Sequence, residues 1–537
     1  MEQIYKLNID DLPDEVLELI ISFLPPYKDL HECMLVCKRW RDCVLNVTRT
    51  KGRNFNRAIA EFNILWKTIT PEAMAPTITK RYSHAAAIHN NSMYVFGGCA
   101  CSMTTFNDLW RLDLSKRQWV RPLTMGTYPS PKACSTMVCY KDTLVLFGGW
   151  TYPSAFPLHQ TWYLFNELHT YDIIENQWSS ISNEVTPPPT AGHSVTIQKE
   201  WMVMYGGLQR ASNAVHSIKT SDIWKLNLET LTWHKQETGI IKPPGRYGHS
   251  QTWLDDNNLL IMGGSGGPSV NYSDAWRLTL TDNLWTWVQV EMRSITEAPD
   301  NLWCNPACRV DNKIIVLSRS KESTEIPPFM YISKGVWVSR EEAERSQRGQ
   351  QHRIDLAHRQ VDRDENVNGR RGVLKGTKKS NPVEVVVAGS SGVQNNRPED
   401  RSIRMAAFAT EKKPEEDVDK QVRQEKIKKA EEAWKKALKA KENAQRVRPR
   451  KILGLYVLDI THALDEKPYV TWLPPTDGGL NCEGPEETVL YTLLQGNSEL
   501  IMFGGIQKDA SSVACTTNLS NQVSNSLHFL TAPSYQF

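Results

Sequence analysis

The sequence lacks the features that would indicate a membrane-spanning, secreted or strongly charged protein. None of its apolar runs reaches the roughly 18 residues that a transmembrane helix needs. The N-terminal stretch MEQIYKLNIDDLPDEV contains no apolar core of a signal peptide. With 63 Lys and Arg against 60 Asp and Glu, the formal charge is only +3 over 537 residues. We therefore expect no membrane partner and no bulk electrostatic attraction to nucleic acid.

The eleven cysteines lack the spacing of a disulfide framework or a zinc site. Most lie within apolar strand or helix patterns, which favours buried, reduced thiols and a cytoplasmic or nuclear location. The sequence also contains no Gly-rich phosphate loop and no Ser-His-Asp spacing. We therefore expect no metal, no cofactor and no catalytic activity.

What is present is a repeat of about 50 residues. Each copy contains an apolar run that ends in two glycines, then a strand that alternates apolar and polar residues. The glycine pairs close the segments MYVFGG (93–98), LVLFGG (144–149), MVMYGG (202–207), LLIMGG (259–264) and LIMFGG (500–505). In the first four copies a tryptophan follows: Trp119, Trp178, Trp233 and Trp287. A single four-stranded sheet cannot bury both of its apolar faces, so the copies must stack on one another.

This pattern resembles the kelch repeat, and the resemblance implies a β-propeller. Counting the copies predicts six blades, of which the fifth has Ser318-Arg319 in place of the glycine pair. Its third and fourth strands are expected after a long insertion, at 453–460 and 470–472. The last copy has no tryptophan strand, whereas residues 62–70 resemble one. We therefore expect this N-terminal strand to complete the sixth blade and to cover two open sheet edges.

The first 50 residues have a different, helical pattern. Leu12-Pro13 precedes two acidic residues and an apolar run that ends at Pro25-Pro26, and a second helical segment begins at Asp29-Leu30. About 40 residues bury little by themselves, so a partner or the propeller should cover them. The order of these features over residues 8–48 resembles the F-box, which implies binding to the adaptor Skp1 and through it to a cullin/RING ligase. A helical cap on the propeller is the alternative.

The resemblance assigns one set of residues to Skp1 binding: Leu12, Pro13, Leu17, Ile20, Leu24, Leu30, Leu35, Cys37 and Trp40. The sequence does not separate those that contact Skp1 from those that fill the core of the module.

The chain is thus predicted to be mostly β, a six-bladed propeller preceded by a small all-α module. Its parts are the F-box module (1–50), a linker that can continue a helix (51–60), the first part of the propeller (61–340, with the closing strand at 61–71), a charged insertion (341–450) and the second part of the propeller (451–537).

The insertion is expected to be largely disordered or helical, with a thin apolar stripe at Ile427, Ala430, Trp434 and Leu438. A solvated helix and a docking helix both remain open there. The basic run at 446–451 leaves nuclear import or nucleic-acid contact open.

The alternating direction of consecutive strands predicts on which side of the propeller a ligand would bind. In antiparallel blades, the loops between the second and third strands emerge on the same side as the loops that join successive blades. Kelch adaptors usually carry the ligand on this side, and Arg, Tyr and Trp are enriched at binding hot spots. The predicted substrate-binding residues are Arg81, Tyr82, Trp150, Tyr152, Gln209, Arg210, Arg246 and Tyr247. The repeat position of Arg81 and Arg246 also allows a structural role.

Three histidines, His84, His193 and His249, recur at one position in three copies. Because this register distributes them around the ring, it favours hydrogen bonding specified by the repeat over a metal site or a general base.

Together, the two resemblances imply a non-catalytic substrate-recognition subunit of a Skp1–cullin–F-box ligase that binds a protein substrate. The alternatives are a non-degradative scaffold and a metal-dependent propeller enzyme, for which we find no converging His and Tyr ligands.

Overall fold

The computed structural model describes residues 9–69, 76–101, 104–152, 163–210, 217–267, 269–281, 284–321, 331–333, 336–338, 452–475, 484–507 and 522–533. The chain divides into a large unit, Met1–Ile326 with Arg450–Phe537, and a second unit, Pro327–Pro449. In the second unit β28 (Tyr331–Ser333) pairs with β29 (Val336–Val338). The predicted insertion at 341–450, with its apolar stripe and most of its basic run, lies outside the described residues. Within the described part, no helix is long and apolar enough to span a membrane.

The large unit begins with a helical module of a short 3-10 turn, η1 (Ile9–Asp11), and three helices: α1 (Asp14–Ser22), α2 (Lys28–Met34) and α3 (Lys38–Ala60). Pro13 lies directly before α1, and Asp14 and Glu15 occupy its first turn, where negative charge complements the helix dipole. The Pro25-Pro26 pair follows α1 and separates it from α2. Helix α3 continues through residues 51–60, so the segment predicted as a linker is the last part of a helix.

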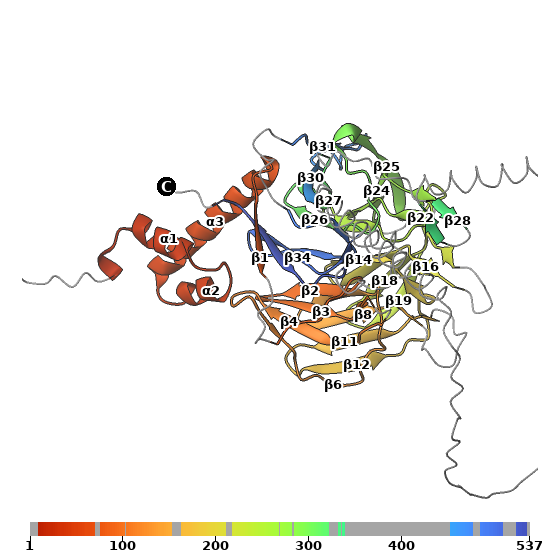
Figure 1. The fold of residues 1–537 in the computed structure, drawn as a ribbon, viewed down its shortest axis with the longest axis horizontal. Coiled ribbons are helices and arrows are strands. Elements are labelled where there is room, and N and C mark those ends of the chain that lie inside the picture. Colours follow the sequence, from red (N-terminus) through yellow and green to blue (C-terminus); the bar gives the residue numbers. More distant parts are fainter. Residues whose placement is uncertain are drawn as a thin grey trace, which may run out of the picture. The chain divides into compact units, whose positions relative to one another are not determined.

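Six blades of four main antiparallel strands follow, numbered in chain order (Figure 1). A short fifth strand pairs with the last strand of blade 2, and a parallel pairing between the last strands of blades 4 and 5 joins these two blades into one eight-stranded sheet. Blade 1 contains β2 (Ala85–His89), β3 (Ser92–Phe96), β4 (Leu109–Asp113) and β5 (Gln118–Val120). Blade 2 contains β7 (Thr136–Tyr140), β8 (Thr143–Phe147), β11 (Leu168–Asp172) and β12 (Gln177–Ile181). Blade 3 contains β14 (Ser194–Gln198), β15 (Trp201–Tyr205), β18 (Ile223–Asn227) and β19 (Thr232–Gln236).

The other three blades have the same strand order. Blade 4 contains β20 (Ser250–Trp253), β21 (Asn258–Met262), β24 (Ala275–Thr279) and β25 (Thr286–Arg293). Blade 5 contains β26 (Ala307–Val310), β27 (Lys313–Arg319), β30 (Leu453–Asp459) and β31 (Tyr469–Trp472). Blade 6 contains β33 (Thr492–Gln495), β34 (Glu499–Phe503), β36 (Leu527–Thr531) and β1 (Leu65–Ile69). The strands predicted for blade 5 on either side of the insertion therefore pair, as β27 with β30.

Shorter elements extend the loops between these strands. They are β6 (Met125–Gly126), β9 (Trp150–Thr151), β10 (Tyr163–Leu164), β13 (Thr190–Ala191), β16 (Leu208–Gln209), β17 (Ile218–Lys219), β22 (Ser265–Gly267), β23 (Val270–Asn271), η2 (Ile295–Glu297), β32 (Thr488–Val489) and β35 (Ile506–Gln507).

The N-terminal strand β1 closes the propeller, as the sequence predicts. It pairs antiparallel with β36 in a continuous register from Leu65 opposite Thr531 to Ile69 opposite Leu527. In Figure 1 the red β1 accordingly belongs with the blue strands from the other end of the chain. Because three strands of blade 6 come from one end of the chain and one from the other, the ring cannot open at this point without breaking that register.

A ring of six backbone hydrogen bonds joins the inner ends of the blades. Each blade contributes one residue, whose N–H donates to the carbonyl of its counterpart in the neighbouring blade, over 2.9 to 3.1 Å. The six, in order of donation, are Ser83, Leu490, Cys304, Gly248, Gly192 and Cys134, which donates back to Ser83. All six have positive φ angles, between 50° and 67°. We call this set the axial ring. It shows that the six blades close on one another.

The glycine pairs join neighbouring blades just outside the axial ring. The second glycine of a pair donates its N–H to the backbone carbonyl that precedes the next blade, as Gly98 does to Lys132 over 2.9 Å. Gly98 has a φ of 94°, and a Cβ atom there would lie 2.8 Å from the carbonyl oxygen of Tyr82. Glycine is required at this position both by its backbone conformation and by the lack of space.

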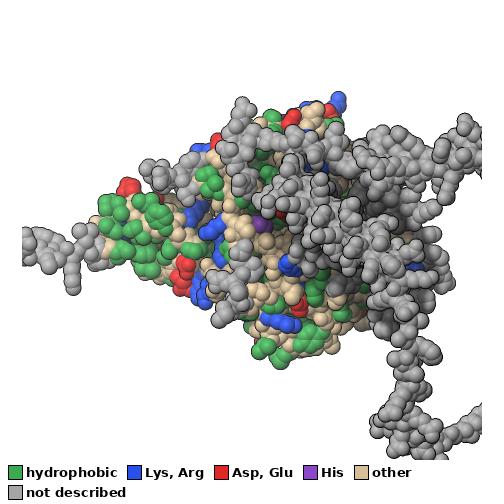
Figure 2. Space-filling view, viewed as in Figure 1, with side chains coloured by type: hydrophobic (Ala, Val, Ile, Leu, Met, Phe, Trp, Pro, Cys, Tyr) green, Lys and Arg blue, Asp and Glu red, His purple; other side chains and the backbone are tan. Residues whose placement is uncertain are grey.

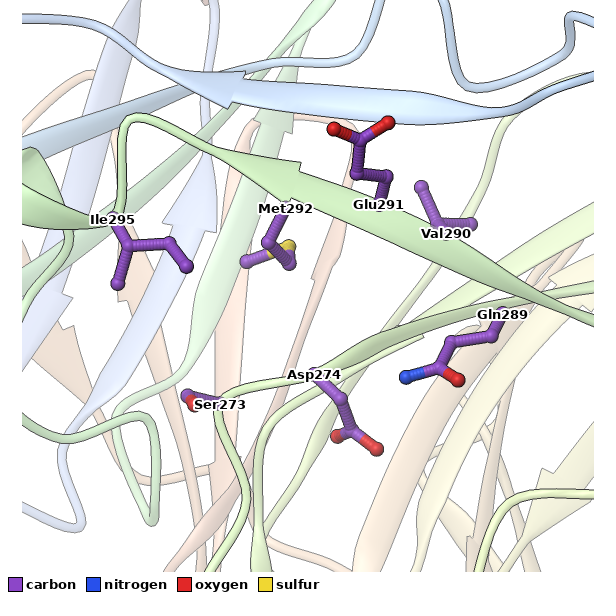
Figure 3. Close-up of a pocket in the computed structure, with 7 residues that line it drawn as sticks. All are labelled: Ser273, Asp274, Gln289, Val290, Glu291, Met292 and Ile295. Atoms are coloured by element: carbon purple, nitrogen blue, oxygen red, sulfur yellow. The ribbon is translucent and has the colours of Figure 1, made fainter.

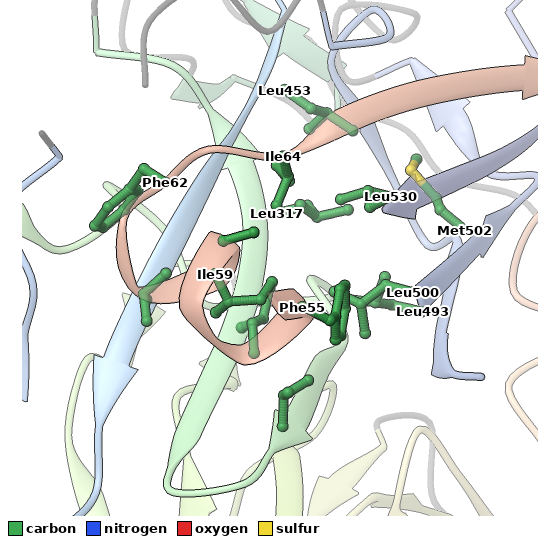
Figure 4. Close-up of a cluster of buried hydrophobic side chains, with 14 of the residues drawn as sticks. Phe55, Ile59, Phe62, Ile64, Leu317, Leu453, Leu493, Leu500, Met502 and Leu530 are labelled. Carbon is green, nitrogen blue, oxygen red and sulfur yellow. The ribbon is translucent and has the colours of Figure 1, made fainter. Parts of the chain in front are cut away.

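Helix α3 connects the helical module to the propeller through a shared core. Its second half inserts Phe55, Ala58 and Ile59 among apolar residues of blades 5 and 6, including Leu317 and Leu500 (Figure 4). Its first half contributes Cys43, Val44 and Val47 to the separate core of the helical module. One continuous helix thus belongs to both cores.

We expect Gly98→Ala to reduce the free energy of unfolding by about 3 kcal/mol or more, because it combines a left-handed backbone with a backbone clash. The matched control is Gly52→Ala in the middle of α3, where no atom lies within 4 Å of the added Cβ. This control should stabilise the protein by roughly 0.5–1 kcal/mol, since alanine is the better helix former. Chemical denaturation of the two variants measures both values. Equal stabilities would contradict the role assigned to the glycine pair.

Candidate functional site

The side chains of the described residues can be compared with the requirements of a metal site and of a general acid or base. Within them, no group of three or more His, Cys, Asp or Glu side chains could hold a metal ion. The pocket in Figure 3, about 450 Å³ beside β25, contains the carboxylates Asp274 and Glu291. Asp274 binds Arg246 at 2.6 Å, and Glu291 binds Arg293 at 3.0 Å. Because both carboxylates already bind cations, this pocket does not resemble the site of a general acid or base.

The three repeat histidines form hydrogen bonds between neighbouring blades, which confirms the structural role predicted for them. His84 Nε2 lies 2.7 Å from Thr492 Oγ1, His193 Nε2 lies 2.7 Å from Thr136 Oγ1, and His249 Nε2 lies 2.6 Å from Ser194 Oγ. Burial lowers the pKa of each of these histidines from 6.5 to about 3. They are therefore neutral in the folded protein at neutral pH.

Two of the predicted substrate-binding residues, Arg81 and Arg246, are structural instead. Both side chains are fully buried and form bidentate ion pairs within their own blades, Arg81 with Asp108 and Arg246 with Asp274. Each also donates to the carbonyl of the first glycine of its blade's pair, over 2.9 Å. The prediction that they bind a substrate is wrong, because a completely buried guanidinium cannot reach a ligand.

The charge of Arg81 also determines the ionisation of its partner. Burial alone would raise the pKa of the Asp108 carboxyl, but the hydrogen bonds and charge of Arg81 outweigh burial and lower this pKa. The indole N–H of Trp110 donates to the same carboxylate over 2.7 Å. Blade 2 contains a variant of this network, in which Lys132 binds Glu167 at 2.6 Å and His169 takes the place of the tryptophan.

The remaining predicted residues differ in their exposure. Gln209 is buried and donates to Thr190 Oγ1 over 3.1 Å, so the prediction that it binds substrate is also wrong. The others keep part of their surface open to solvent: Tyr82, Trp150, Tyr152, Arg210 and Tyr247. They lie on the loops between second and third strands or on the loops that enter the blades. We call these five the loop-face residues. Their role in ligand binding stays a prediction.

Burial divides the residues predicted to bind Skp1. Leu17 and Leu30 are buried in the core of the helical module, with Leu24 and Trp40 packed against it. Leu17 and Leu30 therefore stabilise the module and cannot be direct contacts, which corrects the prediction for these two. Pro13, Ile20, Leu35 and Cys37 are exposed and Leu12 is partly exposed. The F-box pattern could not separate the two groups because both are mostly apolar and lie close together in the sequence.

The helical module exposes more large apolar side chains than its size requires. They include Val16, Leu19 and Ile20 on α1, Phe23 directly after it, and Leu35 and Val36 between α2 and α3. Phe23 is 78% exposed and Leu35 is 64% exposed, values that are unusual for such large apolar side chains. Hydrophobic side chains accordingly gather over the module at the left of Figure 2. We call these six residues the helical apolar surface.

The helical module contacts the propeller at the strand ends opposite the loop-face residues. The Lys28 N–H donates to Ser115 Oγ, in the turn between the third and fourth strands of blade 1. The side chain of Asn497, in the turn between the first and second strands of blade 6, donates to the Pro26 carbonyl over 2.7 Å. These turns lie at the other end of the strands from the loops that carry the loop-face residues. These contacts of the module therefore lie away from the loop-face residues.

Comparison with known proteins identifies both parts of the chain. Residues 9–48 match the family model "F-box-like", and residues 81–287 match "FBX42, beta-propeller domain". Kelch domain-containing protein 1 of Mus musculus is 27% identical over 280 residues, which cover 48% of this chain and 66% of the relative. Its Homo sapiens counterpart is 25% identical over 279 residues, with the same shares. Kelch domain-containing protein 2 of Bos taurus is 27% identical over 294 residues, 49% and 69% of the two chains. The chain thus spans just under two thirds of the length of the first two relatives.

The low pKa values of the repeat histidines predict a loss of stability in acid. Each pKa is about 3 in the folded protein against an ordinary value of 6.5, so the unfolded chain binds more protons between these pH values. Their contribution to stability is complete above pH 6.5 and decreases as the pH falls toward 3, by about 1.4 kcal/mol per pH unit for each histidine.

Chemical denaturation between pH 7.5 and 5 measures this dependence. We expect His249→Asn to reduce the slope by about one proton relative to the unmodified chain. A slope that His249→Asn does not alter would mean that folding does not lower the pKa of this histidine.

The buried ion pairs predict that Arg81→Ala destabilises the propeller. It would leave Asp108 without its cation, which costs about 3–5 kcal/mol for buried pairs. The matched control is Arg41→Ala, at an exposed position of α3, which should change stability by less than about 1 kcal/mol. The unfolding free energies of the two variants test this difference. An Arg81→Ala protein of normal stability would contradict the structural role assigned to this ion pair.

Proposed function

This chain is an F-box/kelch-type protein, and from that premise we propose that it is the substrate-recognition subunit of a Skp1–cullin–F-box ubiquitin ligase. In this proposal the helical module binds Skp1, and through it a cullin/RING ligase. The propeller binds the protein that is to be ubiquitylated. Such a subunit positions its partners and needs no catalytic residue of its own.

The helical apolar surface is the observation that carries this proposal. Val16 and Ile20 on α1 and Phe23 at its C-cap are spaced four and three residues apart, so they share one side of the helix. Leu17 and Ile21 lie on a different side and fill the core. An amphipathic helix with a second, exposed apolar side is suited to a hydrophobic groove of a partner protein. A helical cap on the propeller would bury this second side, and the structure leaves it open.

The loop face supports the second half of the proposal. The loop-face residues include four aromatic side chains, and aromatic side chains and arginine provide much of the binding energy at protein interfaces. Since the module contacts the opposite strand ends, a substrate and Skp1 would not compete for the same surface. We include a cytoplasmic or nuclear location in the proposal. All nine cysteines among the described residues are unpaired, which fits a reducing compartment.

We expect Phe23→Asp to reduce Skp1 capture by at least tenfold, because a carboxylate cannot be buried unpaired in an apolar interface. The fold should be retained, since this side chain is 78% exposed. The matched control is Ile174→Asp, a 69% exposed apolar residue in a turn of blade 2, which should leave capture unchanged. A pull-down of the full chain with purified Skp1, together with melting curves, tests both. If the unmodified chain captures no Skp1, the non-degradative scaffold replaces the ligase subunit as the preferred function.

A further inference from the structure

A single tyrosine of the helical module inserts into the propeller. Tyr27 lies in the turn between α1 and α2, and its side chain is 3% exposed. Its hydroxyl donates to Glu499 Oε1 over 2.5 Å, although the two residues are 472 positions apart in the chain. From blade 1, Arg117 donates to both oxygens of the same carboxylate, over 2.9 and 2.8 Å. The Glu499 carboxylate thus joins the module, blade 6 and blade 1.

The propeller surface is shaped to receive this side chain. A Cβ atom at Gly496 would lie 2.3 Å from the Tyr27 hydroxyl, so the ring is seated directly against a glycine. The Asn497 N–H donates to the same hydroxyl over 3.4 Å. Beside it, the Lys28 N–H donates to Ser115 Oγ over 3.1 Å. Burial and the nearby Glu499 carboxylate raise the pKa of Tyr27, so its hydroxyl keeps its proton.

The receiving site belongs to the propeller alone. Glu499 and Arg117 form a bidentate ion pair without Tyr27, and the Arg117 guanidinium lies 3.6 Å from the centre of the Phe529 ring. All three are propeller residues. The module contributes only the tyrosine, so a change at Tyr27 should leave the carboxylate paired and the blades intact. Stability of the propeller and attachment of the module can therefore be separated by mutation.

Helix α3 provides the other attachment, through Phe55 and Ile59 in the core shown in Figure 4. One attachment alone would let the module pivot about the end of α3. A second attachment on a different blade, away from that core, prevents this rotation. Tyr27 packs with blade 1 and blade 6 residues in a separate cluster that includes Trp119 and Phe529.

We propose that Tyr27, Glu499 and Arg117 form a clamp that holds the helical module in one orientation on the propeller. If the chain is a ligase subunit as proposed above, Tyr27 is a positioning residue. It would hold the Skp1-binding surface at a constant distance and angle from the substrate on the loop face. The orientation itself does not depend on that function and can be measured directly.

Gly496→Ala is the variant that opens the clamp from the propeller side. Its added Cβ meets the Tyr27 hydroxyl at 2.3 Å, whereas its next contacts, at 3.2 Å, are with the flexible side chains of Glu499 and Ile501. In the double variant Gly496→Ala/Tyr27→Phe the close contact is removed, so the ring can return to its site. The control is Gly239→Ala, where no atom lies within 4 Å of the new Cβ.

Hydrogen exchange of the full chain, followed by mass spectrometry of overlapping peptides, distinguishes these variants. We expect Gly496→Ala to accelerate exchange of the Lys28 and Asn497 amides by about tenfold or more, because each loses its hydrogen-bond acceptor. The double variant should restore protection at Lys28 but not at Asn497, whose acceptor is the missing hydroxyl. Gly239→Ala should change neither. Unchanged protection of Lys28 in Gly496→Ala would overturn the clamp.

The positioning role is tested in a reconstituted ligase with purified Skp1, cullin, RING protein and ubiquitin. The measurement is the set of lysines on this chain that become ubiquitylated by its own ligase. A rigid module should direct ubiquitin to a restricted set, and Gly496→Ala should distribute it over at least twice as many lysines, with Skp1 capture unchanged. An unchanged set, despite faster exchange at Lys28, would overturn the positioning role. Loss of all Skp1 capture by the unmodified chain would instead refute the ligase function and leave the clamp intact.

Discussion

The axial ring is the constraint on which the rest of the propeller depends. Each of its six hydrogen bonds requires a residue with positive φ at the start of a blade, and four of these residues are not glycine. A left-handed conformation at Ser83, Cys134, Cys304 or Leu490 costs about 1–2 kcal/mol per residue. The six backbone hydrogen bonds, which all donate in the same direction around the ring, offset this cost only if the ring is complete. The inner ends of all six blades therefore keep this arrangement only while β1 closes the propeller.

Two further layers of contacts explain why the repeat contains the residues it does. Outside the axial ring, the glycine pairs of five blades join each of these blades to a neighbour, and His84, His193 and His249 also link neighbouring blades through their imidazoles. Within blades 1 and 4, the Arg–Asp pairs hold the first strand against the third. These contacts are polar, specific in direction and buried or partly buried, so they order the blades as well as stabilising them. The residues that recur in the repeat are thus mainly those that connect the strands and the blades.

What the sequence could predict was local or periodic. Blade number, the split fifth blade and the closing strand follow from copies of one pattern, and the histidines follow from their shared register. The axial ring could not be found in this way, because its residues are serine, cysteine, glycine and leucine and share only a backbone angle. The pattern also could not show that Arg81 is buried or that Leu17 faces inward, since both depend on tertiary packing. The Tyr27–Glu499 contact joins residues 472 positions apart and leaves no sequence signal.

The arrangement assigns different tasks to the two ends of the strands. Short turns at one end receive the helical module, through Ser115 and Asn497, while the longer loops at the other end carry the loop-face residues. The module is attached to this end twice, through α3, which belongs to both cores, and through Tyr27, which contacts Glu499 of blade 6. A propeller built in this way can change its loops, and so its ligand, without altering the surface that holds the helices. Separation of the two ends, more than any single residue, is the structural feature on which the proposed function rests.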